Sequence, residues 1–379
     1  MNRTSCIFVT QYFPPLLGGA ASRNRNIYLH LRKLGLNCKL ITFRPLIKRG
    51  EIPRNRVRDL FLFTCYSFLS FFITSITTSY DILLLSSPPI TIGPLAFLGR
   101  LLRKIVLIDV QDIWPESLVE EGYLKKNSPM YVVLSLCEDI AYKYANRIIT
   151  VSPYLADQIR QKTKKEIFVL MSGADPNFFR PKVVDPSLRI KLGIEGKKVI
   201  LYSGKIDKAQ SIENILFALK EVVRDYSNVI FLIVGSGEEL NSLIELHYRL
   251  KLENHVKFLH PVSQPVLVDL IALSDICVVP LHEYEKGALP TKFFEYLSCG
   301  KPILATSSLE IDKILREAGA GIFVLNPRDR SLIARSLLKL LTDDELRVKM
   351  GKKGRQYSLT NFDFSKNISK LVGDLLWQR

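Results

Sequence analysis

The sequence is poor in the residues that build metal sites and disulfide frameworks. It has six cysteines and five histidines in 379 residues, and both kinds are scattered with no paired metal-ligand spacing. Dispersed cysteines are typical of reduced thiols in the core of a cytosolic protein, and they do not form the framework of a small secreted domain. We therefore expect no metal and no cofactor.

The chain also lacks low-complexity tracts and a clear internal repeat, and we expect no signal peptide. The first ten residues are too short for a signal sequence and are typical of a first β-strand. Hydrophobic residues make up 47% of the chain and charged residues 24%. This composition indicates a globular protein with a large core, and its length is enough for two or three domains.

Acidic residues are scarce at the N-terminal end. Residues 1–58 contain twelve lysines or arginines and one acid, Glu51, whereas residues 191–379 contain 27 basic and 23 acidic residues. The net charge of the whole chain is +16. A basic face predicts an anionic partner. Because no nucleic-acid-binding motif accompanies it, we expect lipid or phosphate and not nucleic acid.

One uncharged stretch is long enough to span a membrane. Leu60–Ser79 has twelve apolar residues and eight serines or threonines. A span is possible by length, but it would separate the first strand and helix from the rest of the same sheet. We favour an interfacial, monotopic segment with a basic collar, and a buried core helix is the other alternative. The collar consists of Arg44, Lys48, Arg49, Arg54, Arg56 and Arg58.

Short apolar runs alternate with helical patterns in both halves of the chain. Continuous apolar strands separated by helices predict parallel sheets that are covered on both faces. The expected strands are Cys6–Thr10, Cys38–Phe43, Asp81–Leu85, Ile105–Val110, Arg147–Val151, Glu166–Met171, Lys198–Tyr202, Val229–Val234, Val256–Phe258, Ile276–Pro280, Pro302–Ala305 and Ile322–Val324. The expected helices are Ala21–Leu34, Pro129–Tyr144, Ser211–Asp225, Glu238–Leu250, Pro265–Ala272, Thr291–Ser298, Arg330–Leu341 and Asp343–Ser358.

The pattern predicts an α/β protein with two doubly wound, Rossmann-like domains that face a cleft. We expect an N-terminal domain over residues 1–180, against which a C-terminal helix of about residues 360–379 packs. A second domain is expected over residues 190–359, after a linker rich in Pro and Asp between Pro176 and Leu192. Ligands of such sheets bind at the carboxyl ends of the strands, so the active site is expected between the two sheets.

The helix predicted over Thr291–Ser298 carries one base and one acid three positions apart. Lys292 and Glu295 therefore share a face of that helix. A lysine at a helix N-terminus suits a phosphate group, and a carboxylate can accept hydrogen bonds from sugar hydroxyls. Together they suit a sugar nucleotide. The alternative is an ordinary amphipathic helix whose charges face water.

Polar and glycine-rich residues follow the first strand. Gly18 and Gly19 precede a helix, where exposed backbone N–H groups can approach an anion closely. Arg23 and Arg25 lie in the first turns beyond them and are candidates to contact phosphate. The alternative is a plain turn between a strand and a helix.

Three other strands end in candidate site residues. Gln111 and Asp112 follow one strand of the first half, at the position where α/β sheets hold ligands. Gly204 and Lys205 end the first strand of the second half and suit a diphosphate, and Gly235 stands in a G-x-G turn. Each of these segments has a solvated or structural loop as its alternative.

With these segments in order, the chain resembles the retaining glycosyltransferases of family 4, which have the GT-B fold. The DIWPES and PTKFFEYLSCGKP strings are similar to the subgroup that builds O-antigen and capsular polysaccharides, including fucosamine transferases. The six matching motifs are YFPPLLGG at 12–19, DVQDIWPES at 109–117, YSGK at 202–205, VGSGEEL at 234–240, SDICVVPL at 274–281 and PTKFFEYLSCGKPILAT at 290–306.

The resemblance implies a role for several of these residues. Glu295 would bind the nucleotide ribose, and Lys292 and Lys205 would act on the leaving diphosphate. The Gly18–Gly19 loop would border the donor, and Asp112 would act on or position the acceptor. The donor-binding set also includes Gly204, Gly235 and Gly287.

The chain departs from the family pattern at three positions. Gln111 stands where the family often has a histidine, and Gln210 stands where it has a lysine. Gly287 replaces the first of two glutamates that the family places eight positions apart. That glutamate contacts the donor sugar, so backbone N–H groups at Gly287–Leu289 are expected to do part of its work.

The resemblance implies a metal-independent, retaining transferase in O-antigen or capsule biosynthesis. It would move a sugar, with N-acetylated amino sugars among the candidates, from a UDP-linked donor to a lipid-linked, polyprenyl diphosphate acceptor. We expect a peripheral or monotopic protein on the anionic inner face of the cell membrane. The alternatives are a GT-B nucleotide-sugar epimerase and a non-catalytic, membrane-associated binding protein.

Overall fold

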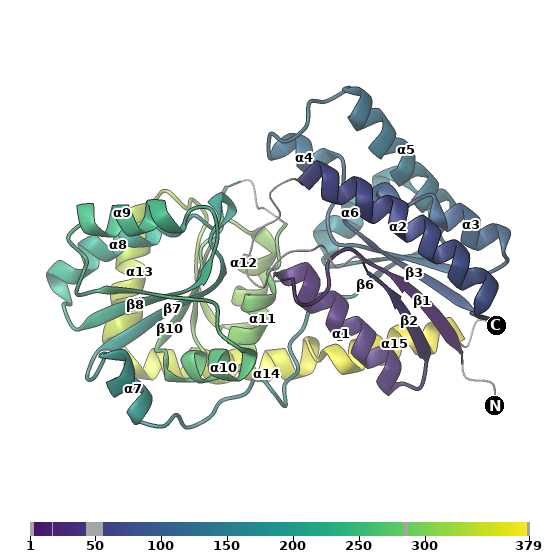
Figure 1. Cartoon of the computed structure of the whole chain (residues 1–379). Coiled ribbons are helices and arrows are strands. Elements are labelled where there is room, and N and C mark those ends of the chain that lie inside the picture. The colour runs from purple at the N-terminus through teal and green to yellow at the C-terminus, as the bar shows by residue number, and fades with distance from the viewer. Residues whose placement is uncertain (1–3, 17, 43–55, 284–286, 377–379) are drawn as a thin grey trace. The chain divides into compact units, whose positions relative to one another are not determined.

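The structure is a computed structural model that describes residues 4–16, 18–42, 56–283 and 287–376. The chain forms two compact units (Figure 1). Unit 1 comprises Met1–Met171 together with Ser365–Arg379, and unit 2 comprises Ser172–Phe364. The expected α/β class, with two parallel sheets covered by helices, is confirmed.

Unit 1 is built on a six-stranded sheet in the order β2-β1-β3-β4-β5-β6, in which every pair of neighbours is parallel. Its strands are β1 (Ser5–Val9), β2 (Asn37–Ile41), β3 (Ile82–Ser87), β4 (Ile105–Val110), β5 (Arg147–Thr150) and β6 (Ile167–Val169). Its helices are α1 (Gly19–Lys33), α2 (Arg56–Thr77), η1 (Ile90–Ile92), α3 (Leu95–Leu101), α4 (Glu116–Glu120), α5 (Pro129–Tyr144), α6 (Pro153–Lys162) and α15 (Phe364–Leu376).

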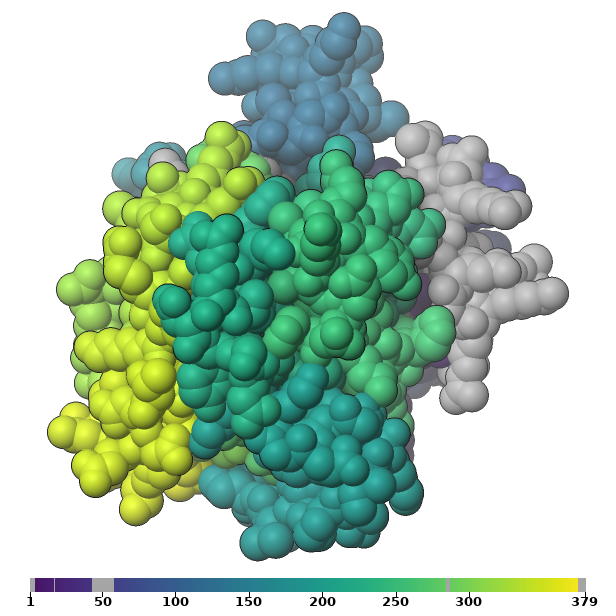
Figure 2. All heavy atoms as spheres, turned by 90° about the vertical axis from the view of Figure 1, so that its left-hand side faces the viewer, coloured from purple at the N-terminus to yellow at the C-terminus, as the bar shows by residue number. Residues whose placement is uncertain are grey.

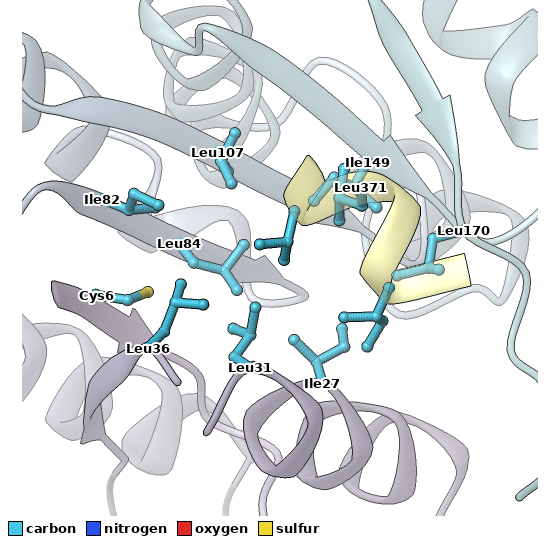
Figure 3. Close-up of a pocket in the computed structure, with 12 residues that line it drawn as sticks. Cys6, Ile27, Leu31, Leu36, Ile82, Leu84, Leu107, Ile149, Leu170 and Leu371 are labelled. Carbon is cyan, nitrogen blue, oxygen red and sulfur yellow. The ribbon is translucent and has the colours of Figure 1, made fainter. Parts of the chain in front are cut away.

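Successive strand residues in unit 1 serve two separate hydrophobic layers, because side chains alternate across a sheet. Ile7 of β1 belongs to the core cluster that includes buried side chains of α2, α3, α5 and α6. Its neighbour Cys6 lines a small apolar pocket on the other side (Figure 3). Ile27 of α1 and Leu371 of α15 line the same pocket. The C-terminal helix is thereby part of the core of unit 1.

The uncharged segment Leu60–Ser79 forms most of α2, and this helix buries only one side. Phe63 and Phe71 lie in the core of unit 1 with no more than 2% of their surface exposed. Only 22% of the apolar window in Arg58–Thr77 is buried, however, and Phe61 and Ile76 are 65% and 71% exposed. Because a core helix would be mostly buried, the core-helix alternative does not describe α2. The collar residues 44–54 lie outside the described residues.

Unit 2 is built on a second parallel sheet, in the order β12-β11-β10-β7-β8-β9. Its strands are β7 (Lys198–Lys205), β8 (Val229–Ser236), β9 (Val256–Leu259), β10 (Ile276–Val279), β11 (Ile303–Thr306) and β12 (Gly321–Val324). Its helices are α7 (Ser187–Leu192), η2 (Lys208–Gln210), α8 (Ile212–Asp225), α9 (Leu240–Arg249), α10 (Gln264–Leu273), α11 (Thr291–Ser298), α12 (Leu309–Ala318), α13 (Arg330–Thr342) and α14 (Asp344–Asn361).

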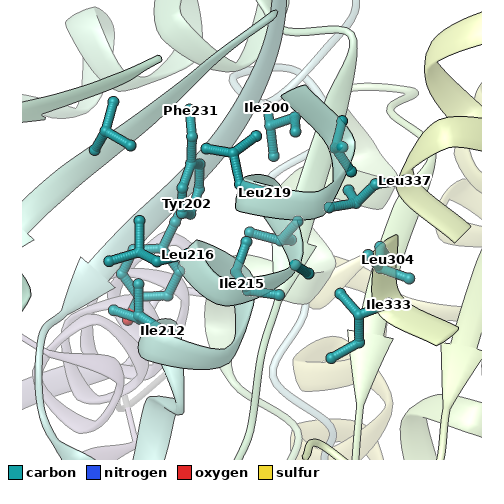
Figure 4. Packing of buried hydrophobic residues seen from close by; sticks show 14 of the residues in the cluster. Ile200, Tyr202, Ile212, Ile215, Leu216, Leu219, Phe231, Leu304, Ile333 and Leu337 are labelled. Carbon is teal, nitrogen blue, oxygen red and sulfur yellow. The ribbon is translucent and has the colours of Figure 1, made fainter. Parts of the chain in front are cut away.

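The core of unit 2 joins segments that are far apart in the sequence. Leu219 of α8 packs with Phe231 of β8 and Leu337 of α13 in one buried cluster (Figure 4). Figure 2 shows a face of unit 2 on which the yellow C-terminal helices lie beside teal and green segments. At the surface, Lys198 of β7 donates to Asp344 of α14 at 3.1 Å. These contacts hold the sheet whose carboxyl edge carries Gly204, Lys205 and Gly235.

Five α-helices, α3, α4, α6, α7 and α12, were not expected from the sequence. Two of them begin at a serine cap: the Oγ atoms of Ser152 and Ser308 accept hydrogen bonds from Leu155 N and Ile311 N. A serine three residues before the capped N–H is the usual start signal of a helix, so α6 and α12 could have been predicted. α3 is short and almost wholly apolar, so periodicity does not distinguish it from a strand.

Because one face of α8 is buried, shortening a side chain on that face should destabilise the protein strongly. Leu219→Ala should lower the free energy of unfolding by about 2–5 kcal/mol, because a fully buried leucine leaves a cavity. Urea unfolding measures the change. The control Leu325→Ala removes a side chain that is 64% exposed and should change stability by less than about 1 kcal/mol. Equal losses would contradict this packing.

Candidate active site

Helix α11 is anchored to the carboxyl end of β7 through Tyr296. The Tyr296 hydroxyl accepts a hydrogen bond from Ser203 N at 2.8 Å and lies 2.9 Å from Ser203 Oγ. The tyrosine ring is fully buried. Pro290 caps the helix without a side-chain hydrogen bond, so the N-terminal turn of α11 begins at Thr291. The anchor brings the predicted Lys292 and Glu295 to the edge of the sheet where parallel strands present ligands.

The side chain of Lys292 is almost completely buried in this edge. Its Nζ donates to Gln210 Oε1 at 2.6 Å and lies 4.0 Å from the centroid of the Tyr202 ring. Among the residues that the structure describes, none places a carboxylate oxygen within 4.0 Å of Lys292 Nζ. Within the described residues, Lys292 therefore has a neutral hydrogen-bond partner and an aromatic face, but no ion pair.

Burial changes the protonation of both site residues on α11. Burial lowers the pKa of Lys292 to about 7, against the opposing fields of Asp207 and Glu295. Burial likewise raises the pKa of Glu295 to about 7, against the opposing field of Lys292. Glu295 keeps part of its surface exposed. Its carboxylate is thus the accessible member of the pair and can accept hydrogen bonds from a ligand.

Two glycines allow the strands and Lys292 to approach one another. Gly204 has φ +142°, and a Cβ there would lie 3.2 Å from Lys292 Nζ. A Cβ on Gly235 would lie 1.9 Å from the carbonyl oxygen of Gly204, so β7 and β8 could not keep their spacing. Gly204 therefore leaves room for the Lys292 side chain, and Gly235 leaves room for the backbone of Gly204. Gly287 is buried, next to residues 284–286, which lie outside the described residues.

Lys205 has a different environment from Lys292. Its side chain is 56% exposed, and its Nζ forms an ion pair with Asp207 at 2.6 Å. Such an exposed pair contributes little to stability and can rearrange around a ligand. Of the two lysines expected at the diphosphate, Lys205 therefore already has a counter-ion, whereas Lys292 has none among the described residues.

Asp112 lies in unit 1, and hydrogen bonds within its own loop occupy both carboxylate oxygens. Oδ1 accepts from Ile113 N at 2.8 Å, and Oδ2 accepts from Ser117 Oγ at 2.7 Å. Burial raises the pKa of Asp112, although these hydrogen bonds and one from Trp114 oppose the shift. The carboxylate shapes the segment that leads into α4. Each oxygen has a second lone pair, so the carboxylate can accept a further hydrogen bond without losing these two.

The expectation that Arg23 contacts phosphate is wrong. Arg23 is 2% exposed and makes a bidentate ion pair with Asp109, at 2.6 and 3.0 Å. Its Nη1 also donates to the carbonyl oxygen of Leu170 at 2.7 Å. The amide nitrogen of Gln111 lies 3.0 Å from Asp109 Oδ2 and 2.9 Å from Asn24 Oδ1. Arg23 and Gln111 are therefore parts of a buried network at the end of β4.

The Gly18–Gly19 pair forms the start of α1. Gly18 is the N-cap residue with φ +124°, a conformation that favours glycine, and Gly19 is the first helical residue. A Cβ on Gly18 would meet nothing within 4 Å, so backbone conformation and not crowding requires the glycine. The N-cap makes no side-chain hydrogen bond. Leu17, in the same motif, lies outside the described residues.

The described part of the chain contains no group of three or more His, Cys, Asp or Glu side chains that could hold a metal ion. Its six cysteines are free thiols: four are buried, Cys137 is partly buried and Cys65 is exposed on α2.

Sequence reasoning did not predict the environment of Lys292. Tyr202 and Gln210 lie 90 and 82 positions before it in the chain, and only the parallel sheet brings them together. Gln210 could have been singled out from the sequence, because it replaces a lysine of the resembled pattern. No local signal identifies Tyr202 as a contact of Lys292.

Residues 184–357, most of unit 2, match the family model described as "Glycosyl transferases group 1". Spore coat protein SA from Bacillus subtilis is 24% identical over 60% of this chain and 63% of its own length. The uncharacterized glycosyltransferase MJ1069 from Methanocaldococcus jannaschii is 22% identical over 98% of this chain and 97% of its own. The chain thus spans less than two thirds of the first relative but nearly all of the second.

Solved structures show the same two-unit fold. The Anabaena protein Alr3699/HepE in complex with UDP-glucose superposes with a TM-score of 0.74 at 17% identity, covering 98% of this chain and 99% of its own. WaaG, a glycosyltransferase involved in lipopolysaccharide biosynthesis, gives a TM-score of 0.72 at 16% identity, covering 96% of this chain and 98% of its own. The chain therefore has the GT-B fold. The group 1 glycosyl transferase model matches residues 184–357 of this fold, which make up most of unit 2.

Because Arg23 is paired within unit 1, its removal should lower the stability of the protein without changing its affinity for UDP. Arg23→Ala leaves a buried carboxylate without its partner and should lower the free energy of unfolding by about 3–5 kcal/mol. Thermal or urea unfolding measures this loss, and calorimetry should find UDP affinity unchanged in the folded fraction. Arg25→Ala, an exposed position on the same helix, is the control and should leave stability nearly unaltered. A stable Arg23→Ala protein with weaker UDP binding would return Arg23 to the ligand site.

Proposed function

We propose that the protein transfers a sugar from a UDP-linked donor to a lipid-linked acceptor, with retention of the anomeric configuration. The observation that carries the proposal is the pair Lys292 and Glu295 at the carboxyl end of β7, inside the segment that matches group 1 glycosyl transferases. Glu295 would accept hydrogen bonds from the ribose. Lys292 would lie against the diphosphate, next to the N-terminus of α8, which has no side-chain cap.

UDP is the preferred nucleotide because a structure of the same fold, that of Alr3699/HepE, is a complex with UDP-glucose. The chemistry then needs positive charge where the diphosphate leaves. A buried ammonium such as Lys292 acts strongly there because little water competes for the anion. Lys205 would contribute more weakly from its exposed position.

For retention, the acceptor hydroxyl would attack the anomeric carbon from the face that the diphosphate leaves. The new bond joins the acceptor oxygen to C1, the bond between C1 and the phosphate oxygen breaks, and the acceptor proton passes to the departing diphosphate. No covalent intermediate with a protein side chain is required. In unit 1, Asp112 would orient the loop that receives the acceptor.

The exposed apolar surface of unit 1 supports a lipid-linked acceptor and an anionic membrane as partners. Monomeric soluble proteins seldom expose large contiguous apolar patches. Apolar side chains are exposed along the whole length of α2. α3 and α5 pack on the same side of the sheet and expose further apolar side chains. The set is Phe61, Leu62, Tyr66, Leu69, Phe72, Ile73 and Ile76 on α2, Phe97 and Leu101 on α3, and Met130, Val132, Val133 and Leu136 on α5.

This surface fits an interfacial helix better than a transmembrane span. α2 is long and apolar enough to cross a membrane, but Phe63 and Phe71 on its other side are in the core of unit 1. A span would have to pull both rings out of that core. An interfacial helix keeps them buried and places the exposed side at the level of the lipid head groups. Exposed Arg100, Arg103, Lys125 and Lys126 flank α3 and α5 and suit anionic lipid.

We therefore propose a peripheral enzyme of the cytoplasmic membrane face that acts in surface polysaccharide synthesis, O-antigen or capsule. WaaG, of the same fold, is involved in lipopolysaccharide biosynthesis, and free thiols fit a reducing compartment. N-acetylated amino sugars are the first donors to test.

A transfer assay tests the reaction. Purified protein is incubated with UDP-N-acetylhexosamines and a polyprenyl diphosphate sugar in vesicles, and NMR reads the configuration of the product. Acceptor-dependent UDP release with a retained α-linkage is expected. An interconverted nucleotide sugar would identify an epimerase, and donor binding without turnover would identify a binding protein.

Glu295→Ala should weaken UDP binding by about 1.5–3 kcal/mol, because hydrogen bonds between the ribose and a charged group are lost. Isothermal titration with UDP measures the change. Glu345→Ala, at an exposed carboxylate of α14, is the matched control and should bind UDP normally. Unaltered affinity in a folded Glu295→Ala protein would remove Glu295 from the donor site.

Membrane binding should depend on the exposed side of α2. Replacing Leu69 and Phe72 by serine removes two side chains that are 61% and 64% exposed, each contributing roughly 1.5–3 kcal/mol when buried in lipid. Flotation with vesicles that contain anionic lipid should fall at least tenfold. The control replaces Ile190 and Val348, exposed residues of unit 2, by serine and should float like the parent. Equal flotation of both variants would exclude α2 as the membrane contact.

A further inference from the structure

The hydrogen bond between Lys292 and Gln210 fixes the orientation of the Gln210 amide. An ammonium group only donates, so the oxygen and not the nitrogen of the amide must face Lys292 Nζ. The observed 2.6 Å contact is indeed to Oε1, and the Tyr202 hydroxyl lies 3.3 Å from the same oxygen. The amide nitrogen therefore faces away from the lysine. Within the described part of the chain, no hydrogen bond from Gln210 Nε2 is found.

The neutrality of Gln210 has an electrostatic consequence. A carboxylate at this distance would form an ion pair and largely cancel the positive charge of Lys292. An amide oxygen holds the ammonium in place through its dipole and leaves the net charge of +1 in the site. Gln210 is partly exposed, at the end of η2, directly before the N-terminus of α8. Its two free N–H groups lie on the same residue that positions the lysine.

We propose that Gln210 is a positioning residue for donor binding: its carbonyl holds Lys292 at the end of β7, its neutrality leaves the charge of Lys292 for the donor's diphosphate, and its N–H groups donate to the same diphosphate. The inference rests on the proposed function, because it assigns the anion to a UDP-sugar. Gln210 stands where the resembled pattern has a lysine. The inference explains how Lys292 can hold the diphosphate without a second buried lysine beside it.

The arrangement couples donor binding to protonation. The charged groups whose fields reach Lys292 are Asp207, on the loop after β7, and Glu295, on its own helix, and Asp207 is paired with Lys205. Burial keeps the pKa of Lys292 near 7 in the empty site. A diphosphate beside the ammonium stabilises the charged form, so binding above pH 7 takes up a proton. The affinity for UDP should fall as pH rises from 7 to 9, by up to about tenfold per pH unit.

Two substitutions separate the parts of this inference. Gln210→Glu keeps an oxygen for Lys292 but supplies a carboxylate, which pairs with the lysine and repels the diphosphate. UDP affinity at pH 7 should fall at least tenfold, and its decline between pH 7 and 9 should flatten because the ion pair keeps Lys292 protonated. Gln210→Met removes the acceptor without adding charge. It should weaken binding less at pH 7 and should keep or steepen the decline with pH.

The experiment is calorimetric titration of the full chain with UDP at pH 7, 8 and 9, in two buffers of different ionisation enthalpy so that proton uptake is measured directly. Gln356→Glu, an exposed position on α14, is the control with the same change in charge and should match the parent. Circular dichroism checks that each variant is folded.

The outcomes distinguish this inference from the proposed function. A parent protein that binds no UDP would overturn both. A parent that binds UDP with proton uptake, together with Gln210→Glu and Gln210→Met proteins that share one affinity and the parent's pH profile, would overturn the role of Gln210 alone. The expected result is a flatter pH profile for Gln210→Glu and a retained or steeper one for Gln210→Met, with the control unchanged.

Discussion

The site in unit 2 depends on one buried ammonium group, Lys292, which has no carboxylate partner among the residues that the structure describes. Removing an ammonium from water is costly, and this cost is normally offset by an ion pair. For Lys292 it is offset by the Gln210 carbonyl, the Tyr202 ring and the fields of two more distant carboxylates. Gly204 has no side chain at the point where Lys292 passes. An anion that binds here would balance the positive charge of Lys292.

Unit 1 also buries a cation, but there a carboxylate offsets the cost of removing it from water. Its buried cation, Arg23, is fully paired with Asp109 and with the Leu170 carbonyl. The network extends through Gln111, so the buried charges at the end of β4 are paired within unit 1. In the function we propose, unit 1 would receive the lipid-linked acceptor beside the exposed apolar side of α2, and unit 2 would hold the diphosphate of the donor at Lys292.

Much of the fold follows directly from the sequence, because buried parallel strands such as Ile82–Ser87 are continuous apolar runs. The placement of Lys292 and Glu295 on one short helix was also predictable from their spacing. The partners of Arg23 and Lys292 were not, since Asp109 and Gln210 lie 86 and 82 positions away and meet them only through strand order. For α2 the sequence favoured an interfacial segment but left a core helix open, because composition alone does not distinguish a core helix from one that covers the core with a single side.

Hydrogen exchange of backbone amides, with and without UDP, tests the central claim that unit 2 holds the nucleotide around Lys292. The account predicts the strongest protection in the first turns of α8 and α11 and in the ends of β7 and β8, and little change along α2 and α5. Protection confined to unit 1, or none at α8 and α11 under saturating UDP, would contradict it.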